Sequence, residues 1–414
     1  MATITRNIGL SLGADICWPL CFEHIMKRLA LRISHQGDTI DFHVERVTIE
    51  PYSLAQPVKY DVVIDRLTHW YDVTREWIKK GVLMNDLYVF NNPFSVQSME
   101  KHTSYSAMLK LGMPIPETWM VPPKSYEALP DLKPTLSKYA QLFDLAAIGK
   151  KIGYPMFMKP YDGGGWKGVT RIKDEAALKK AYDESGTMVM HLQKAVDPFD
   201  LFVRTIGFGP QTHSVLYNPD APLHDRYTMK KESEFLSDAD RQVLEDTTLT
   251  INAFFGWDFN SCESLRNANT QIWNPIDFAN PCPDSQVTSL HYHFPWLVKA
   301  YLKWAIFTAA TKRPMRKAFD WAPFYEIAKK DLSYPEKLKE YGKLSRKILQ
   351  AEEFEEFCAK NLKHLDEVAW EFFATNDAKD AVRQKVTALF PAHEVEPFTE
   401  LFFRRIQQWR ADQK

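Results

Sequence analysis

KPYDGGGWKGV, residues 159–169, opens with a lysine and holds four glycines. It follows the apolar run 154–158, which we expect to form a strand ending at Lys159. Glycines let backbone N–H groups approach anionic oxygens, and the lysine adds a point charge. The segment therefore predicts a phosphate-binding loop. It is neither a Walker A loop nor a Gly-x-Gly-x-x-Gly turn, and a plain glycine-rich hairpin turn is the alternative.

A second informative feature is the pair Glu263 and Asp277, with Asn280 shortly after it. We expect residues 261–265 and 271–278 to form antiparallel strands joined by a turn at 267–269, which would project both carboxylates to one face. Carboxylate and amide oxygens are the ligands that magnesium prefers. Solvent-facing strand residues are the alternative for either acid alone; the pair together favours a metal site.

The composition is that of an ordinary globular protein. Of the 414 residues, 45% are hydrophobic and 25% charged, and 52 basic residues balance 53 acidic ones. The balance gives no support to nucleic-acid binding, which normally needs a basic excess. No apolar run is long enough for a membrane span, and the five scattered cysteines fit a reducing compartment. We therefore expect a cytoplasmic protein that binds neither nucleic acid nor membrane.

Periodicity predicts three regions. Residues 1–92 alternate strands with helices, including a helix over 19–33, and suggest an open α/β domain. Residues 93–310 begin with a helix over 94–111, and the segment at about 150–192 forms a smaller lobe within them. Residues 311–414 carry mainly amphipathic helical patterns.

The order of these features resembles the ATP-grasp superfamily, which holds D-alanine:D-alanine ligase, glutathione synthetase and the ribosomal-protein glutamate ligases. Five segments over residues 60–290 carry the resemblance. They are Asn91-Asn92-Pro93 with Ser98–Lys101, Leu111–Thr118, Ile152–Pro155 with the Lys159 loop, Leu192–Val196, and Ile276–Pro281. The resemblance implies an α/β (α+β) ATP-grasp fold: an N-terminal open α/β domain, a two-lobed nucleotide-binding region and a helical C-terminal extension.

The resemblance also implies roles for individual residues. Lys101 and Lys159 would contact ATP phosphates, and Asp200 would hold the ribose. The loop glycines Gly163, Gly164, Gly165 and Gly168 would close over the phosphates, and Gln193, Lys194 and Ala195 would meet adenine. Glu263, Asp277 and Asn280 would bind Mg²⁺ or Mn²⁺. Arg204, Arg226 and Arg266 are candidates for the γ-phosphate or an acyl phosphate, since a guanidinium matches a phosphate bidentately; Lys230 competes with Arg226.

The resemblance predicts an ATP-dependent carboxylate–amine ligase that works through an acyl phosphate on a small-molecule acid and amine. A homodimer is left open. One alternative is a nucleotide-binding regulatory or scaffold protein without turnover, which intact Lys159, Glu263 and Asp277 disfavour. Another is a kinase that stops at a phosphorylated product, which would need no amine.

Overall fold

The computed structural model describes residues 3–10, 15–49, 51–66, 71–96, 100–126, 134, 138, 143–161 and 168–413. The chain divides into two compact units. The first unit comprises Met1–Ser98, Arg204–Ser261 and Pro281–Lys414, and the second comprises Met99–Val203 and Cys262–Asn280. The division of the chain into three regions stays a prediction.

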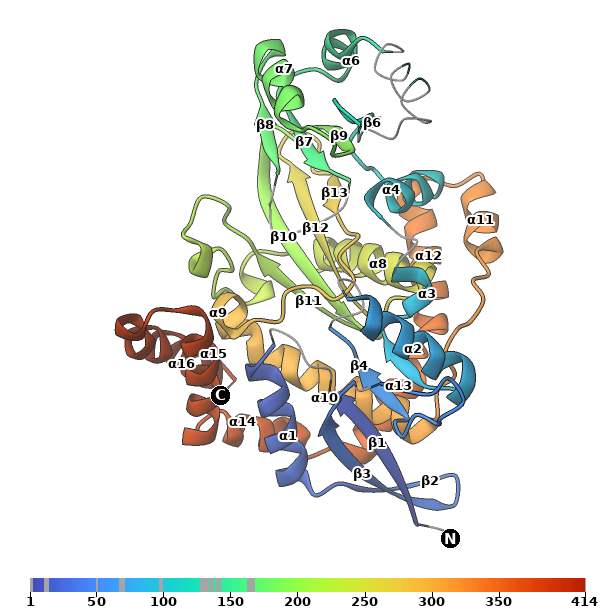
Figure 1. The fold of residues 1–414 in the computed structure, drawn as a ribbon, viewed down its shortest axis with the longest axis vertical. Helices are drawn as coiled ribbons and strands as arrows, with labels where there is room; N and C mark the ends of the chain where they lie inside the picture. Colours follow the sequence, from blue (N-terminus) through green and yellow to red (C-terminus); the bar gives the residue numbers. More distant parts are fainter. Residues whose placement is uncertain are drawn as a thin grey trace. The chain divides into compact units, whose positions relative to one another are not determined.

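The first unit is built on a five-stranded sheet in the order β2-β3-β1-β4-β5 (Figure 1). Its strands are β1 (Thr3–Leu10), β2 (Arg32–His35), β3 (Asp38–Arg46), β4 (Val62–Ile64) and β5 (Tyr88–Phe90). All neighbours are parallel except β2 and β3. Strands β4 and β5 are buried at every position, which is typical of parallel strands covered on both faces.

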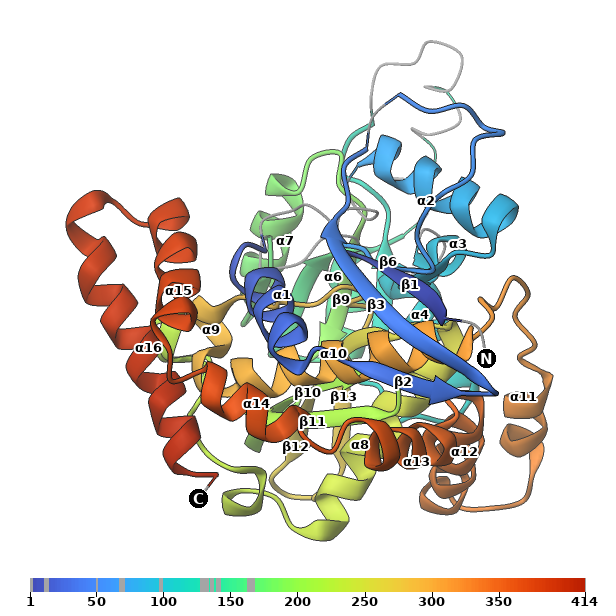
Figure 2. The same ribbon diagram turned by 90° about the horizontal axis from the view of Figure 1, so that it is seen from below.

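Helices surround this sheet. Helix α10 (Phe294–Thr311) packs on β1 and β4, and α1 (Cys17–Leu29) packs on α10 and β3 (Figure 2). Helix α10 is apolar on almost every side, as a core helix must be. The unit's other helical segments before residue 312 are α2 (Asp72–Asn85), α3 (Pro93–Val96), η1 (Leu223–Asp225), η2 (Glu232–Glu234), α8 (Asp238–Phe255), α9 (Val287–Leu290) and η3 (His291–His293).

The C-terminal part of the first unit is helical, as expected. It contains α11 (Ala322–Lys329), α12 (Tyr334–Ile348), α13 (Ala351–Asn361), α14 (Leu365–Phe372), α15 (Asn376–Leu389), η4 (Ala392–Glu394) and α16 (Val395–Ala411). Helix α12 packs on α8, and α14 and α15 pack on α1. The mixed α/β class and the helical C-terminal region are thus confirmed.

Two expected helices are wrong in extent. The helix expected over 19–33 ends at Leu29 because Ala30 takes a left-handed conformation (φ 42°). The chain then forms the β2–β3 hairpin, whose turn at Gln36-Gly37 has positive φ at both residues, the geometry that fits strand twist. The single helix expected over 94–111 is two helices, α3 and α4 (Lys101–Lys110), because Glu100 is extended.

The second unit contains a smaller sheet in the order β6-β9-β7-β8. Its strands are β6 (Thr118–Val121), β7 (Met156–Pro160), β8 (Thr170–Ile172) and β9 (Met190–Lys194), and its further helices are α6 (Leu145–Ile152) and α7 (Glu175–Glu184). One face of the sheet forms an apolar core with α6 and α7, which includes Met156, Met158, Met190 and Leu192. The intervening side chains of β7 and β9 therefore point to the opposite face.

A third sheet has the strand order β11-β10-β12-β13. It comprises β10 (Phe199–Phe208), β11 (Gln211–Leu216), β12 (Phe259–Asn267) and β13 (Trp273–Asp277). The unit boundary falls within β10 and β12. No helix in the described part of the chain is both long and apolar enough to cross a membrane. All five cysteines are unpaired.

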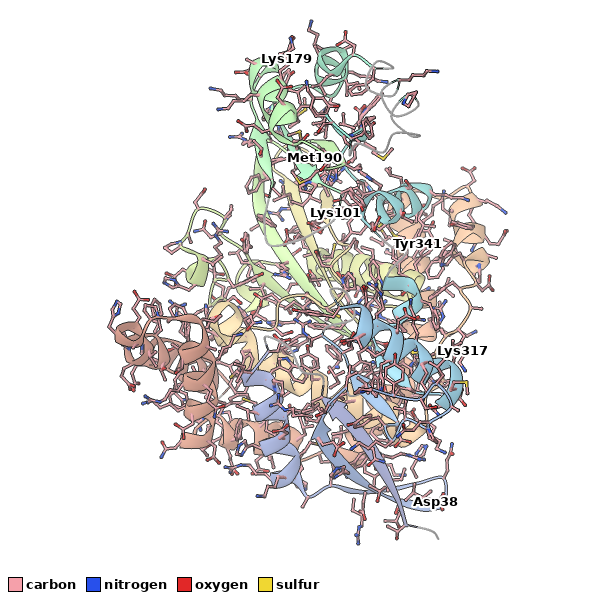
Figure 3. The ribbon with its side chains drawn as sticks, in the orientation of Figure 1. Asp38, Lys101, Lys179, Met190, Lys317 and Tyr341 are labelled. Carbon is pink, nitrogen blue, oxygen red and sulfur yellow. The ribbon has the colours of Figure 1, made fainter. Side chains whose placement is uncertain are left out.

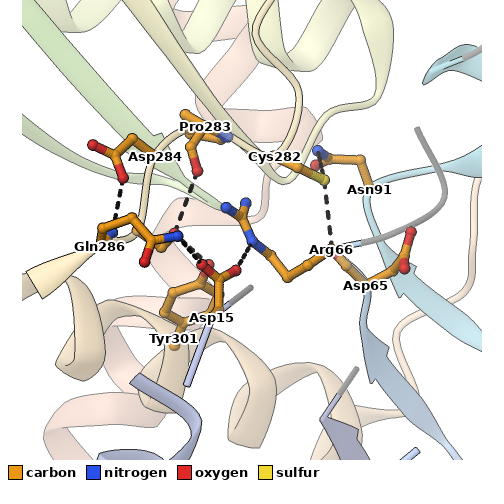
Figure 4. Close-up of polar contacts among 10 residues, drawn as sticks. Asp15, Asp65, Arg66, Asn91, Cys282, Pro283, Asp284, Gln286 and Tyr301 are labelled. Atoms are coloured by element: carbon orange, nitrogen blue, oxygen red, sulfur yellow. Dashed lines mark hydrogen bonds and ion pairs between the residues drawn. The ribbon is translucent and has the colours of Figure 1, made fainter. Parts of the chain in front are cut away.

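A buried ion pair joins two loops of the first unit (Figure 4). Arg66 follows β4 and donates from Nε to Asp15, and the two side chains are 7% and 4% exposed. Gln286 donates to the other carboxylate oxygen of Asp15 at 2.7 Å. Burying a charge is costly unless a partner compensates it, so each member of the pair depends on the other.

Asp15→Asn should lower the free energy of unfolding by about 3 kcal/mol, because it leaves the Arg66 guanidinium uncompensated in the interior. Denaturant titration measures this change. Asp377→Asn is the matched control: it removes an exposed partner, 48% accessible, of Arg28 and should cost less than about 1 kcal/mol. Equal effects of the two substitutions would show that the Asp15–Arg66 pair does not stabilise the first unit.

Candidate functional site

Two of the three predicted metal ligands, Glu263 and Asp277, lie opposite each other in the second unit. Strands β12 and β13 are antiparallel, as expected, and Glu263 pairs directly with Asp277. Directly paired residues project to one face of a sheet, with Cβ atoms about 5 Å apart. A bulge follows Glu263, where the register shifts before Ser264. Asn280 comes three residues after Asp277, beyond the end of β13.

Lys101, labelled in Figure 3, is the first residue of α4, and its side chain contacts Asp277. Its Nζ donates to Asp277 Oδ2 at 2.8 Å, and the two side chains are 7% and 19% exposed. Tyr105, one turn further along α4, donates its hydroxyl to the carbonyl oxygen of Ile276 at 2.7 Å. Helix α4 is therefore hydrogen-bonded to two consecutive residues of β13, Ile276 and Asp277.

Lys159 reaches the same strand from β7. Its Nζ donates to Gln193 Oε1 at 2.8 Å and to the Ile276 carbonyl oxygen at 3.2 Å. Burial lowers the pKa of the Lys159 ammonium to about 8; the negative charge of Asp277 opposes the shift, and the positive charge of Lys101 adds to it. The second unit therefore brings together Lys101, Lys159, Glu263 and Asp277, which the sequence singled out separately.

The segment expected to contact adenine makes hydrogen bonds to other residues of the second unit. Gln193 accepts from Lys159 and donates from Nε2 to Thr118 Oγ1 at 3.1 Å. The backbone amides of Lys194 and Ala195 donate to the carbonyl oxygens of Glu117 (2.9 Å) and Pro155 (3.2 Å). The side chain of Gln193 is thus engaged in holding Lys159, and an adenine contact of this segment stays a prediction.

Two residues with separately expected roles bind each other. Arg266 donates to both carboxylate oxygens of Asp200, at 3.0 and 2.8 Å, and its guanidinium lies 5.7 Å from the ring centre of Trp273. The hydrogen bonds from Arg266 lower the pKa of the Asp200 carboxyl. The resemblance implies that Asp200 binds the ribose and that Arg266 binds a phosphoryl group. It does not predict an ion pair between them. Both roles stay predictions.

Most of the glycine loop, including Gly163, Gly164 and Gly165, lies outside the described residues. Gly168 is described, with φ +71°. A Cβ added there would lie 2.9 Å from Pro160 Cγ, so the position requires glycine for both its backbone conformation and its space. The entry of the chain into β8 therefore depends on this residue.

The other two candidate arginines belong to the first unit. Arg204 is buried, and it donates to Ser261 Oγ at 3.0 Å and to the hydroxyl of Tyr227. Arg226 donates to the carbonyl oxygen of Ala221 at 3.2 Å. Their contact with a phosphoryl group stays a prediction.

Arg405, which the sequence does not single out, holds the segment around Arg226. It lies in α16 and donates to the carbonyl oxygen of His224 at 2.8 Å and to the carboxylate of Asp225. The ring of Phe398, also in α16, contacts the His224 ring at 5.6 Å. The sequence predicts only amphipathic helical patterns for this region, because the pairing of residues so far apart in the chain leaves no local pattern.

Two histidines of the second unit, His191 and His102, are likewise absent from the residues expected at the site. His191 lies in β9 on the same face as Gln193, and its ring meets those of His102 and Tyr105 edge to face. A signal for it is present in the sequence: a histidine interrupts the apolar run Met188–Leu192 at a position that alternates with core residues.

Among known proteins, no family model matches the chain. A D-alanine–D-alanine ligase of Neisseria gonorrhoeae is 28% identical over 131 residues, which cover 31% of this chain and 34% of the relative. One of Laribacter hongkongensis is 24% identical over 221 residues, 52% of this chain and 60% of the relative. The chain thus spans between a third and three fifths of the length of these relatives. The resemblance to ATP-grasp carboxylate–amine ligases is confirmed by these two proteins.

Solved structures that match the chain include a D-Ala:D-Ser ligase from Enterococcus faecalis, with 13% identity, a TM-score of 0.47, and coverage of 73% of this chain and 99% of that chain. They also include a D-alanine–D-alanine ligase from Bacillus anthracis complexed with ATP, with 12% identity, a TM-score of 0.47, and coverage of 74% of this chain and 98% of that chain.

The lowered pKa of Lys159 predicts how its contribution to stability varies with pH. The unfolded chain keeps this proton up to about pH 10.5 and the folded chain only to about 8, so the unfolded state binds more protons between those values. Below pH 8, Lys159 stays charged in the folded protein, and the cost of burying its charge lowers the free energy of unfolding. As pH rises above 8, the buried group loses its proton and this cost disappears. From pH 7.5 to 9.5, wild type should gain about 2 kcal/mol in unfolding free energy relative to Lys159→Gln. Denaturant titration of both proteins checks this, and a constant difference would contradict it.

Proposed function

We propose that this protein is an ATP-dependent carboxylate–amine ligase that joins a small-molecule acid to an amine with Mg²⁺. The observation that carries the proposal is the convergence, inside the second unit, of the Lys101 and Lys159 ammonium groups on the strand that bears Asp277. Two buried cations beside two carboxylates form a site suited to a polyphosphate and its divalent ion. The similarity to D-alanine–D-alanine ligases supports this assignment.

The residues present fit a magnesium ion bound together with phosphates. Glu263 and Asp277 offer carboxylate oxygens from paired positions, and Asn280 offers an amide oxygen. The described residues contain no group of three or more His, Cys, Asp and Glu side chains that could hold a metal by themselves. Magnesium seldom takes an all-protein cage and is usually shared between one or two carboxylates and substrate phosphates. When bound, it would neutralise charge on the phosphate oxygens.

The chain's own groups supply positioning and charge. A carboxylate is a poor electrophile, so it is activated by taking the γ-phosphoryl group of ATP as an acyl phosphate. The amine then attacks the acyl carbon, the C–O bond to phosphate breaks, and an amide, ADP and phosphate result. Lys101 and Lys159 offset negative charge on the phosphates throughout. No nucleophilic side chain is needed.

The first test measures ADP release with ATP, Mg²⁺ and a panel of acids with and without amines. A ligase releases ADP only when both substrates are present, whereas a kinase needs no amine. Absence of ADP release with every acid, together with tight ATP binding, would favour the scaffold alternative.

Lys159→Ala should weaken ATP binding at least tenfold at pH 7.5, because it removes a buried cation from the proposed phosphate site. Isothermal titration calorimetry measures the dissociation constant. Lys179→Ala is the matched control, since Lys179 lies exposed on α7 and pairs with Glu175, and it should leave the dissociation constant unchanged. Unchanged affinity in Lys159→Ala would refute the phosphate role.

Asp277→Asn should still fold, although with a lower free energy of unfolding because the buried Lys101 loses its carboxylate partner. It should lower kcat at least a hundredfold, since it removes a carboxylate from the proposed metal site. Turnover at increasing Mg²⁺ concentrations checks the prediction. Wild-type turnover in this variant would exclude Asp277 as a metal ligand.

A further inference from the structure

One buried histidine of the second unit has no hydrogen-bond partner. His191 has no exposed surface, and neither Nδ1 nor Nε2 finds a partner in the described structure. Buried polar atoms are nearly always paired, because an unsatisfied group loses its bonds to water without replacement. An apolar side chain of similar size would avoid this cost, so folding alone does not account for an imidazole here.

The surroundings of His191 are those of the proposed phosphate site. Its direct partner across the β7–β9 pair is Lys159. The His102 ring lies 5.2 Å away and the Tyr105 ring 5.7 Å away, both edge to face. His102 Nε2 is buried and likewise lacks a partner in the described structure. Tyr161 stacks on His102 with ring centres 6.2 Å apart, so both imidazoles lie where the chain leaves β7 for the glycine loop.

The imidazole of His191 is neutral in the folded protein. Burial lowers its pKa to about 2, and the charges of Lys159, His102 and Lys101 add to the shift. A neutral imidazole carries one N–H donor and one acceptor nitrogen. Beside two ammonium groups, it can offer a hydrogen bond without adding a third buried positive charge.

We propose that His191 and His102 bind the phosphate chain of the nucleotide, each donating a ring N–H to a phosphate oxygen. The inference rests on the proposed function, because it places the nucleotide at Lys101 and Lys159. Phosphate oxygens accept hydrogen bonds and do not donate them when ionised, which matches donors surrounded by cations. A base or ribose would match the unpaired nitrogens but would make no use of the two ammonium groups.

His191→Phe separates this role from packing, because phenylalanine keeps an aromatic ring and lacks the nitrogens. Calorimetry with ATP, AMP and inorganic phosphate, and thermal unfolding of the ligand-free protein, are the two measurements. ATP affinity should fall about tenfold or more, as expected for a lost hydrogen bond to a charged group. AMP affinity should change less than ATP affinity. The melting temperature should stay the same or rise, because an unsatisfied buried group has been removed.

His293→Phe is the matched control. His293 is also buried, but Nδ1 contacts His213 Nε2 at 2.8 Å and Nε2 contacts the Thr228 carbonyl oxygen at 2.8 Å. This variant should melt at a lower temperature and bind ATP as wild type does. His102→Phe, at a half-buried position, provides a second reading if His191→Phe does not fold, and it should weaken ATP binding in the same direction.

Each other outcome overturns the inference in a distinct way. Wild-type ATP affinity in both His191→Phe and His102→Phe, with wild type binding ATP, refutes the histidine role and leaves the proposed function standing. If wild type binds no ATP, the proposed function fails and the inference fails with it. If only inorganic phosphate binding depends on the histidines, they form a free-anion site and the nucleotide assignment is wrong.

Discussion

The attachment of two lysine ammonium groups to one short strand is the constraint on which the candidate site depends. Lys101 reaches the Asp277 carboxylate from α4, and Lys159 reaches the adjacent Ile276 carbonyl oxygen from β7. Both side chains are buried, so each must be compensated by nearby oxygens. The nearby oxygens do not fully compensate the burial of the Lys159 charge, because its pKa is still lowered to about 8. A site in this state gains from an incoming polyanion, because added negative charge relieves a cost already present.

Strand alternation explains how so small a sheet can be both a core and a polar site. On β7 and β9, Met156, Met158, Met190 and Leu192 enter the apolar cluster, and the residues between them face the other way. Lys159, His191 and Gln193 lie on that second face, which α4 meets through the His102 and Tyr105 rings. A shift of register by one residue would exchange the two faces, so core packing also fixes the positions of the polar groups.

The sequence predicted what local pattern determines. Alternating apolar residues and a polar turn specify the β12–β13 hairpin, so the pairing of Glu263 with Asp277 could be expected from the amino acids alone. It did not predict contacts between distant segments, such as Lys101 with Asp277, 176 residues apart, or Asp200 with Arg266. Such contacts depend on the packing of whole elements and leave no periodic signal. The β2–β3 hairpin is not predicted for a different reason. Apolar residues at helical spacing continue past Leu29 to Ile33, which lies in β2, so the pattern predicts a longer helix there.

The hydrogen bonds of Arg405 to the segment around Arg226 have a consequence for biosynthesis. Arg405 follows Asp225 by 180 residues, so the ribosome must make nearly half of the chain after this segment before the contact can form. Until then, His224 and Asp225 lack the guanidinium that holds them. The first unit therefore completes its structure late, well after the strands of the second unit have been synthesised.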